Sequence, residues 1–126
     1  MFAKPQLFML HFAGGSCFSF DFLLPYLQDL EVYRLELPGR GKRMGKPFLS
    51  THNSAVQDYL DQILAKLSGA PFAIYGHSMG ASLGAYVTSR LEALGYCPER
   101  LIVSGNAGPG VGENKFRHKM PKAAFL

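Results

Sequence analysis

The chain alternates between two kinds of hydrophobic pattern. Short continuous apolar runs end at glycine or proline, and such runs predict strands that are buried on both faces. Longer stretches place apolar residues three or four positions apart, which predicts amphipathic helices. The predicted strands are residues 7–13, 32–37, 72–76 and 101–105, and the predicted helices are residues 20–30, 54–67 and 79–94.

Local signals refine the ends of these elements. Pro25 lies inside the first predicted helix, so we expect that helix to be short or kinked. Ser54 and Gln57 have the spacing of a capping box at the start of helix 54–67, and Gly69 follows its end. After strand 101–105 we expect a loop and the start of a further helix.

Strands that alternate with helices predict an α/β fold, with a mostly parallel sheet and helices on both faces. The 126 residues show no repeat, low-complexity tract or internal boundary, so we assign residues 1–126 to a single domain. An antiparallel pair among the four predicted strands would contradict this assignment.

Composition narrows the class of protein. Hydrophobic residues make up 48% of the chain and charged residues 17%, which is a globular balance. No apolar run approaches the roughly 20 residues that span a bilayer, so we expect no membrane insertion. The apolar start has only Lys4 as a basic residue and is better interpreted as a strand than as a secretion signal. Cys17 and Cys97 fit neither a metal site nor a disulfide framework, which favours a reduced, cytoplasmic setting.

The net charge of +4 is unevenly distributed. No nucleic-acid motif accompanies the basic residues, so we expect no nucleic-acid partner. An acidic protein or acidic substrate explains the charge equally well, and a solvated surface remains an alternative. The two basic clusters are Arg40, Lys42, Arg43 and Lys46, and Lys115, Arg117, Lys119 and Lys122.

The stretch IYGHSMG carries the pattern G-x-S-x-G around Ser78. A predicted strand precedes it and a predicted helix follows, which is the context of a nucleophile elbow. Strand and helix nearly touch at such a turn, so the residues two positions from the serine must be small, and Gly76 and Gly80 fill both places. We therefore predict that Ser78 is a nucleophile and that His77 is a structural residue of the elbow.

A serine nucleophile also needs an oxyanion hole. One donor is the backbone N–H of the residue after the serine, here Met79, and the other comes from the loop after an earlier strand. Gly14 and Gly15 would let that loop approach a substrate closely, so we choose the N–H of Ala13 as the second donor. A simple turn at this loop is the alternative.

Four blocks together resemble a known family. LHFAGGSCFSF, LELPGRGKRM, PFAIYGHSMGASLGAY and LIVSGNAGPG are similar, in order and spacing, to the stand-alone (type II) thioesterases of polyketide and nonribosomal peptide synthesis, within the α/β-hydrolase superfamily. The tail RHKMPKAAFL resembles the entry into the lid of that family, except that Lys122 stands where an Asp is usual. The resemblance implies the N-terminal half of a three-layer fold, truncated after about four strands in the order 32–37, 7–12, 72–76 and 101–105.

The resemblance also implies a reaction, the hydrolysis of acyl groups held as thioesters on the phosphopantetheine arm of a carrier protein. Ser78 would attack the carbonyl, the N–H groups of Ala13 and Met79 would hold the oxyanion, and no further cofactor or metal is implied. Acyl or peptidyl carrier proteins are acidic, so we expect Arg40, Lys42 and Arg43 to contact one. A monomer is expected for the complete protein.

The base and acid of a triad are not evident in the chain. The expected order is serine, acid and then histidine, whereas His11 and His52 precede Ser78. His118 follows it, but no carboxylate follows His118, and the only acid after Glu99 is Glu113, in a glycine-rich loop. The resemblance implies that acid and base lie beyond Leu126, so we expect this chain alone to be almost inactive, with strand 101–105 as an unpaired apolar edge. The alternatives are a non-catalytic module that binds carrier proteins and part of a general lipase or carboxylesterase.

Overall fold

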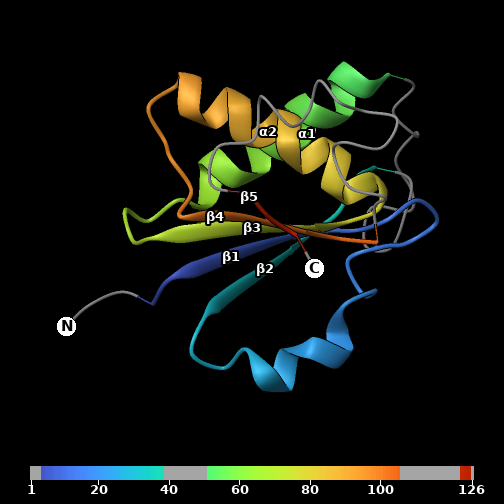
Figure 1. Cartoon of the computed structure of the whole chain (residues 1–126), viewed down its shortest axis with the longest axis vertical. Helices are drawn as coiled ribbons and strands as arrows, with labels where there is room; N and C mark the ends of the chain where they lie inside the picture. The colour runs from blue at the N-terminus through green and yellow to red at the C-terminus, as the bar shows by residue number, and fades with distance from the viewer. Residues whose placement is uncertain (1–3, 39–50, 106–122, 126) are drawn as a thin grey trace.

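A computed structural model describes residues 4–38 and 51–105 and the backbone of residues 123–125. Its strands form one sheet in the order β2-β1-β3-β4-β5, and every neighbouring pair is parallel (Figure 1). The strands are β1 (Gln6–Leu10), β2 (Glu31–Leu35), β3 (Phe72–His77), β4 (Arg100–Ser104) and β5 (Ala123–Phe125), and the helices are η1 (Asp21–Tyr26), α1 (His52–Lys66) and α2 (Met79–Ala93).

The helices are divided unequally between the two faces of the sheet. Figure 1 shows α1 and α2 side by side on one face, and the short 3₁₀ helix η1 on the other. All described connections between neighbouring parallel strands are crossovers, so the carboxyl ends of β1, β2, β3 and β4 meet at one edge of the sheet. Ligand sites of open α/β sheets form at that edge.

The main hydrophobic core lies between the sheet and the two α-helices. Phe8, Leu10 and Ile74 point into it from β1 and β3 and have no exposed surface. The helices contribute apolar side chains at helical spacing, which is why the sequence pattern identified both of them. The buried apolar residues of α1 and α2 include Ala55, Val56, Tyr59, Leu60, Ile63, Ala81, Leu83, Ala85, Val87 and Leu91.

A smaller core lies on the opposite face. Leu7 and Met9, which alternate with Phe8 and Leu10 along β1, pack there against Phe20 at the start of η1. Because successive residues of a strand point to opposite faces, one apolar run supplies both cores.

The predicted α/β class, the parallel direction and the order of the four predicted strands are confirmed. The predicted helix 79–94 corresponds closely to α2. The prediction of a capping box at Ser54 is wrong, because α1 begins at His52 and its N-cap is Thr51, whose side chain accepts a hydrogen bond from the N–H of Ser54 at 3.0 Å.

Two further expectations need correction. Residues 20–30 do not form an α-helix, because the hydrogen bonds in this segment run from residue i to i+3, as from Leu23 N–H to Phe20 O and from Leu27 N–H to Leu24 O. Strand 101–105 is not an unpaired edge, because β4 pairs with β5 through Leu101, Ile102 and Val103. Within the described residues, the sheet therefore has five strands and its edges are β2 and β5.

Candidate active site

Ser78 occupies the turn that joins the end of β3 to the start of α2. Its backbone has φ 54° and ψ −112°, and it is the one non-glycine residue with positive φ in the described part of the chain. Such a conformation costs on the order of 1–3 kcal/mol and persists only where the surroundings impose it. One of these constraints is a hydrogen bond from Ser78 N–H to Ser104 O at 2.9 Å, which joins the turn to the end of β4.

The lack of a side chain at Gly76 and Gly80 allows the close backbone contacts around this turn. A Cβ atom at Gly76 would overlap the carbonyl oxygen of Gly80, so β3 and the first turn of α2 are in direct backbone contact. A Cβ atom at Gly80 would overlap the carbonyl oxygen of Leu10 and lie 2.9 Å from that of His11. The two glycines therefore bring α2 against β3 on one side and against the end of β1 on the other.

The start of α2 directs backbone N–H groups toward the serine. The first intrahelical hydrogen bonds run to Ser78 O from Ala81 N–H at 3.0 Å and from Ser82 N–H at 3.3 Å. The N–H of Met79 lies before these bonds, among the groups that a helix leaves without an intrahelical partner. Together with the helix dipole, this arrangement favours negative charge near Ser78.

The loop after β1 lies beside this turn. Its backbone folds back with a hydrogen bond from Gly15 N–H to Phe12 O at 2.8 Å, and Gly14 has φ 77°, as the third residue of a type II turn requires. That bond uses neither the N–H of Ala13 nor that of Gly14. The ring of Phe12 contacts the ring of His77, with centroids 5.4 Å apart, so the turn that carries Ala13 adjoins the elbow that carries Ser78.

The ring of His77 contacts a polar side chain of the sheet. Its Nδ1 lies 3.0 Å from Ser104 Oγ, which is also 2.6 Å from the hydroxyl of Tyr75. A Cβ atom at Gly105 would overlap the His77 ring. Sequence reasoning did not single out Ser104, although a small polar residue at the end of an apolar strand next to the elbow was a visible signal.

The other two described histidines are engaged elsewhere. His11 is buried, with Nδ1 3.0 Å from Phe12 O, and its Nε2 accepts a hydrogen bond from Leu37 N–H at 3.3 Å. His52 packs its ring against Tyr86 at the start of α1. No described contact therefore supplies the base for Ser78.

Several residues from the sequence predictions lie outside the described residues. They are Arg40, Lys42, Arg43, Glu113 and His118. The carrier-protein contact of the three basic residues therefore stays a prediction, and a triad of Ser78, Glu113 and His118 stays an alternative. Among the described residues, no group of three or more His, Cys, Asp or Glu side chains has the geometry of a metal site. In the same part of the chain, no helix has the length and apolar content needed to cross a bilayer.

Comparison with known proteins gives consistent matches. The family model described as "Thioesterase domain" matches residues 5–126. The "Thioesterase PikA5" of Streptomyces venezuelae is 30% identical over 96% of this chain and 44% of its own length. "Linear gramicidin dehydrogenase LgrE" of Brevibacillus parabrevis is 28% identical over 98% of this chain and 48% of its own length.

The solved structures agree with this result. The type II thioesterase BorB from the borrelidin biosynthetic cluster superposes with a TM-score of 0.79 and 30% identity, over 86% of this chain and 44% of that protein. The chain thus spans about half the length of these relatives. Its predicted α/β-hydrolase type of sheet and its resemblance to type II thioesterases are confirmed.

Proposed function

The chain belongs to the thioesterase domain family, and we propose that the complete protein hydrolyses acyl thioesters with Ser78 as its nucleophile. In this proposal the acyl group is carried on the phosphopantetheine arm of a carrier protein. Relatives from polyketide and nonribosomal peptide biosynthesis support thioester hydrolysis in such a pathway. The elbow geometry supports the choice of the serine.

The observation that carries this proposal is the conformation of Ser78. The backbone of Ser78 is strained at the start of a helix and fixed between two glycines that admit no side chain, as in a nucleophile elbow, which presents its hydroxyl at the carboxyl edge of the sheet. An ordinary strand-to-helix turn does not need such strain. Strain of this kind gathers where a side chain must be presented for chemistry.

The reaction follows from these groups in two steps. Ser78 Oγ adds to the thioester carbonyl while a base takes its proton, and the N–H groups of Met79 and Ala13 stabilise the resulting oxyanion. Collapse of this intermediate breaks the C–S bond, and the proton passes to the departing thiol. Water then attacks the acyl ester of Ser78 and releases the carboxylic acid. The base is supplied by a part of the complete protein outside the described residues.

A matched pair of serine variants tests the nucleophile. In the complete protein, Ser78→Ala should lower kcat for an acyl N-acetylcysteamine thioester on the order of 10⁶-fold, whereas Ser82→Ala, one turn further along α2, should leave it within twofold. Release of free thiol in the absence of nicotinamide reports hydrolysis rather than the dehydrogenase reaction named for the gramicidin relative. Retained activity in Ser78→Ala would place the chemistry elsewhere.

A second measurement tests the substrate class. We expect acyl groups on an acidic carrier protein to be hydrolysed with a higher kcat/KM than p-nitrophenyl esters of the same acid. Neutralising Arg40, Lys42 and Arg43 together should raise KM for the carrier-bound substrate and leave the small thioester unaffected, with a difference that shrinks at high salt. Equal rates on all substrates would instead favour a general esterase.

The 126-residue chain by itself should bind a carrier protein but hydrolyse its thioester slowly, because the described histidines have other partners and none supplies the base for Ser78. Loss of a triad base removes most of the rate and leaves only the oxyanion and binding contributions. Turnover by this chain near the ~10 s⁻¹ of an ordinary enzyme would direct attention to His118. Binding without any hydrolysis by the complete protein would favour a non-catalytic carrier-binding module.

A further inference from the structure

Glu36 is a buried carboxylic acid that the proposed reaction does not use. It follows β2 directly and has 4% of its surface exposed. Placing a carboxylate in such a position is costly unless strong hydrogen bonds compensate for the lost water. The contacts of Glu36 therefore indicate what it stabilises.

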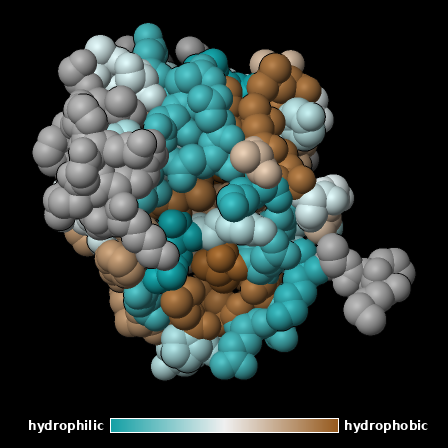
Figure 2. Space-filling model, turned by 180° about the vertical axis from the view of Figure 1, so that it is seen from behind, coloured by the Kyte–Doolittle hydropathy of each residue, from teal (hydrophilic) through white to brown (hydrophobic). Residues whose placement is uncertain are grey.

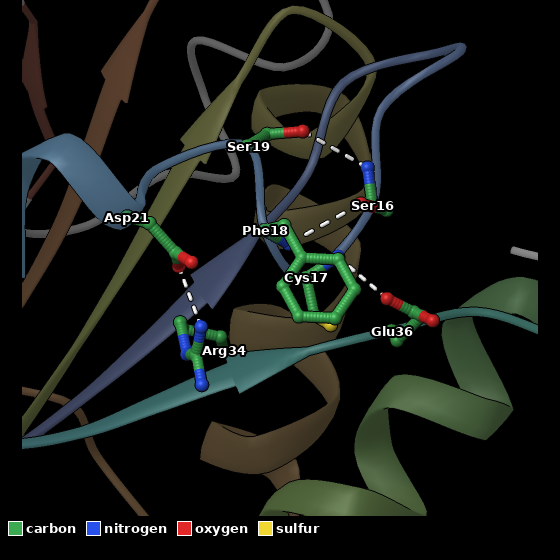
Figure 3. Close-up of polar contacts among 7 residues, drawn as sticks. All are labelled: Ser16, Cys17, Phe18, Ser19, Asp21, Arg34 and Glu36. Carbon is green, nitrogen blue, oxygen red and sulfur yellow. Dashed lines mark hydrogen bonds and ion pairs between the residues drawn. The ribbon is translucent and has the colours of Figure 1, made fainter. Parts of the chain in front are cut away.

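The carboxylate holds the backbone of the loop that follows β1. Its Oε2 accepts a hydrogen bond from Cys17 N–H at 2.6 Å, and Cys17 is itself buried, with 5% exposed (Figure 3). A hydrogen bond from a backbone N–H to a charged oxygen is shorter and stronger than a neutral one. This bond joins positions 19 residues apart in the sequence.

Cys17 belongs to a compact segment, so the bond positions more than a single residue. Ser16 N–H donates to Ser19 Oγ at 2.9 Å, Ser19 N–H donates to Ser16 O at 3.1 Å, and Phe18 N–H donates to Ser16 Oγ at 3.2 Å. Figure 3 shows this segment folded over the carboxylate at the end of β2. Glu36 therefore anchors residues 16–19 as a unit.

The neighbouring residue anchors the other side of the turn. Leu37 N–H donates to Nε2 of His11, which precedes the turn of residues 12–15, whereas Glu36 holds Cys17, which follows it. Two adjacent residues thus fix both ends of the segment that contains Ala13. In addition, the side-chain amide of Gln62 in α1 donates to Glu36 O at 3.0 Å, so the anchor is itself tied to the helical layer.

From this geometry we propose that Glu36 is a positioning residue for the oxyanion hole. Its carboxylate, through Cys17, keeps the turn of residues 12–15 in the place where the N–H of Ala13 meets the developing oxyanion. The inference rests on the proposed serine hydrolase function. An oxyanion donor must be held in place before the reaction, because its contribution depends on a geometry that is not rebuilt during each turnover.

The test compares Glu36 variants in the complete protein with a control in η1, directly after the segment of residues 16–19. Glu36→Ala removes the acceptor, Glu36→Gln keeps an oxygen that can accept from Cys17 N–H, and Glu36→Asp shortens the reach. Asp21→Asn is the control, since it weakens the partly exposed ion pair, 2.5 Å long, between Asp21 of η1 and Arg34 of β2. The substrate is an acyl N-acetylcysteamine thioester, and the probe is an alkylboronic acid, whose boron forms a tetrahedral anion on a serine oxygen.

We expect Glu36→Ala to lower kcat about 10- to 100-fold, less than the 10²–10³ typical for outright removal of one oxyanion donor. KM should stay within about threefold, and the inhibition constant of the boronic acid should rise by the same factor as kcat falls. Glu36→Gln should recover most of both losses, and Glu36→Asp should lie between. Asp21→Asn should leave kcat and boronic acid affinity within twofold.

A Glu36→Ala protein with unchanged kcat and boronic acid affinity would overturn the inference, as would a loss of kcat without a loss of boronic acid affinity. If Glu36→Ala does not fold, Glu36→Asp decides by the same two readouts, and wild-type values for both would overturn it. Failure of the underlying function looks different: Ser78→Ala would retain activity, or boronic acid would not inhibit the wild-type protein.

Discussion

On one face of the sheet, Phe8, Ile74 and Leu101 lie under α1 and α2 with at most 1% of their surface exposed. Among the described residues, the other face carries one helix, the six-residue η1. There Ala73 and Ile102 line an apolar hollow of about 220 Å³. Figure 2, seen from behind, shows hydrophobic residues at the surface in the lower half of the molecule, with a second group at the upper right.

This difference in packing between the two faces indicates which contacts fix the geometry of the candidate site. α2 begins at the residue after Ser78, so the packing of α2 on the sheet fixes the direction of the serine. The contact of Gly80 with the carbonyl of Leu10 belongs to the same tightly packed face. Parallel sheets are ordinarily covered on both faces, and here the helical face supplies the close backbone contacts of the elbow.

The largest effect should come from breaking the close contact on the helical face. Gly80→Val would force a branched side chain into the carbonyl oxygens of Leu10 and His11. Rigid backbone cannot yield as a side chain does, so we expect the cost to approach the whole stability of a small domain, about 5–15 kcal/mol. Circular dichroism should show loss of the folded state. Ser89→Val, at an exposed site of the same helix, is the control and should remain folded.

A smaller loss of stability should distinguish the packing of the two sheet faces. Ile74→Ala removes a fully buried side chain and should cost about 2–5 kcal/mol of unfolding free energy. Ile102→Ala, on the other face, removes a half-buried one and should cost less than half as much in the 126-residue chain. Urea unfolding of both variants measures the ratio. Equal losses would show that the two faces are packed alike, and a larger loss for Ile102→Ala in the complete protein would show that its face is covered there.

The smallest effect concerns the N-terminus of α1. Thr51→Ala removes the side chain that accepts from Ser54 N–H and should cost about 1 kcal/mol. Ser54→Ala keeps that N–H and should cost less. Thermal melts of the two variants test the cap, and a greater loss for Ser54→Ala would restore the capping box that the sequence suggested.

The regular elements were predictable because each has one dominant periodicity. The apolar spacing of α2 and the glycines around Ser78 indicate a helix and an elbow without any tertiary information. Residues 20–30 misled because Phe20, Leu23, Leu24 and Leu27 have helical spacing, whereas Pro25 leaves room for only a short 3₁₀ segment. The spacing of apolar residues shows which side chains can be buried together. It does not show whether the backbone forms i to i+4 or i to i+3 hydrogen bonds.

The bond between Glu36 and Cys17 was beyond sequence reasoning for a different reason. Two residues 19 positions apart meet only after β1 and β2 have paired, so no local window contains both. A weak signal existed, since Glu36 is an acidic residue between Leu35 and Leu37 at the end of an apolar strand. Such a residue is either exposed by alternation or buried with a partner, and only the assembled sheet decides between them.

The positive φ of Ser78 opposes stability to the proposed activity at a single position. Glycine adopts φ 54° without the steric cost that a Cβ atom brings, so Ser78→Gly should unfold at a higher temperature than Ser78→Ala while lacking the hydroxyl. A directed-evolution campaign that rewards heat resistance alone would therefore favour glycine at the proposed nucleophile. A thermostable version of this domain has to gain its stability elsewhere and keep the strained serine.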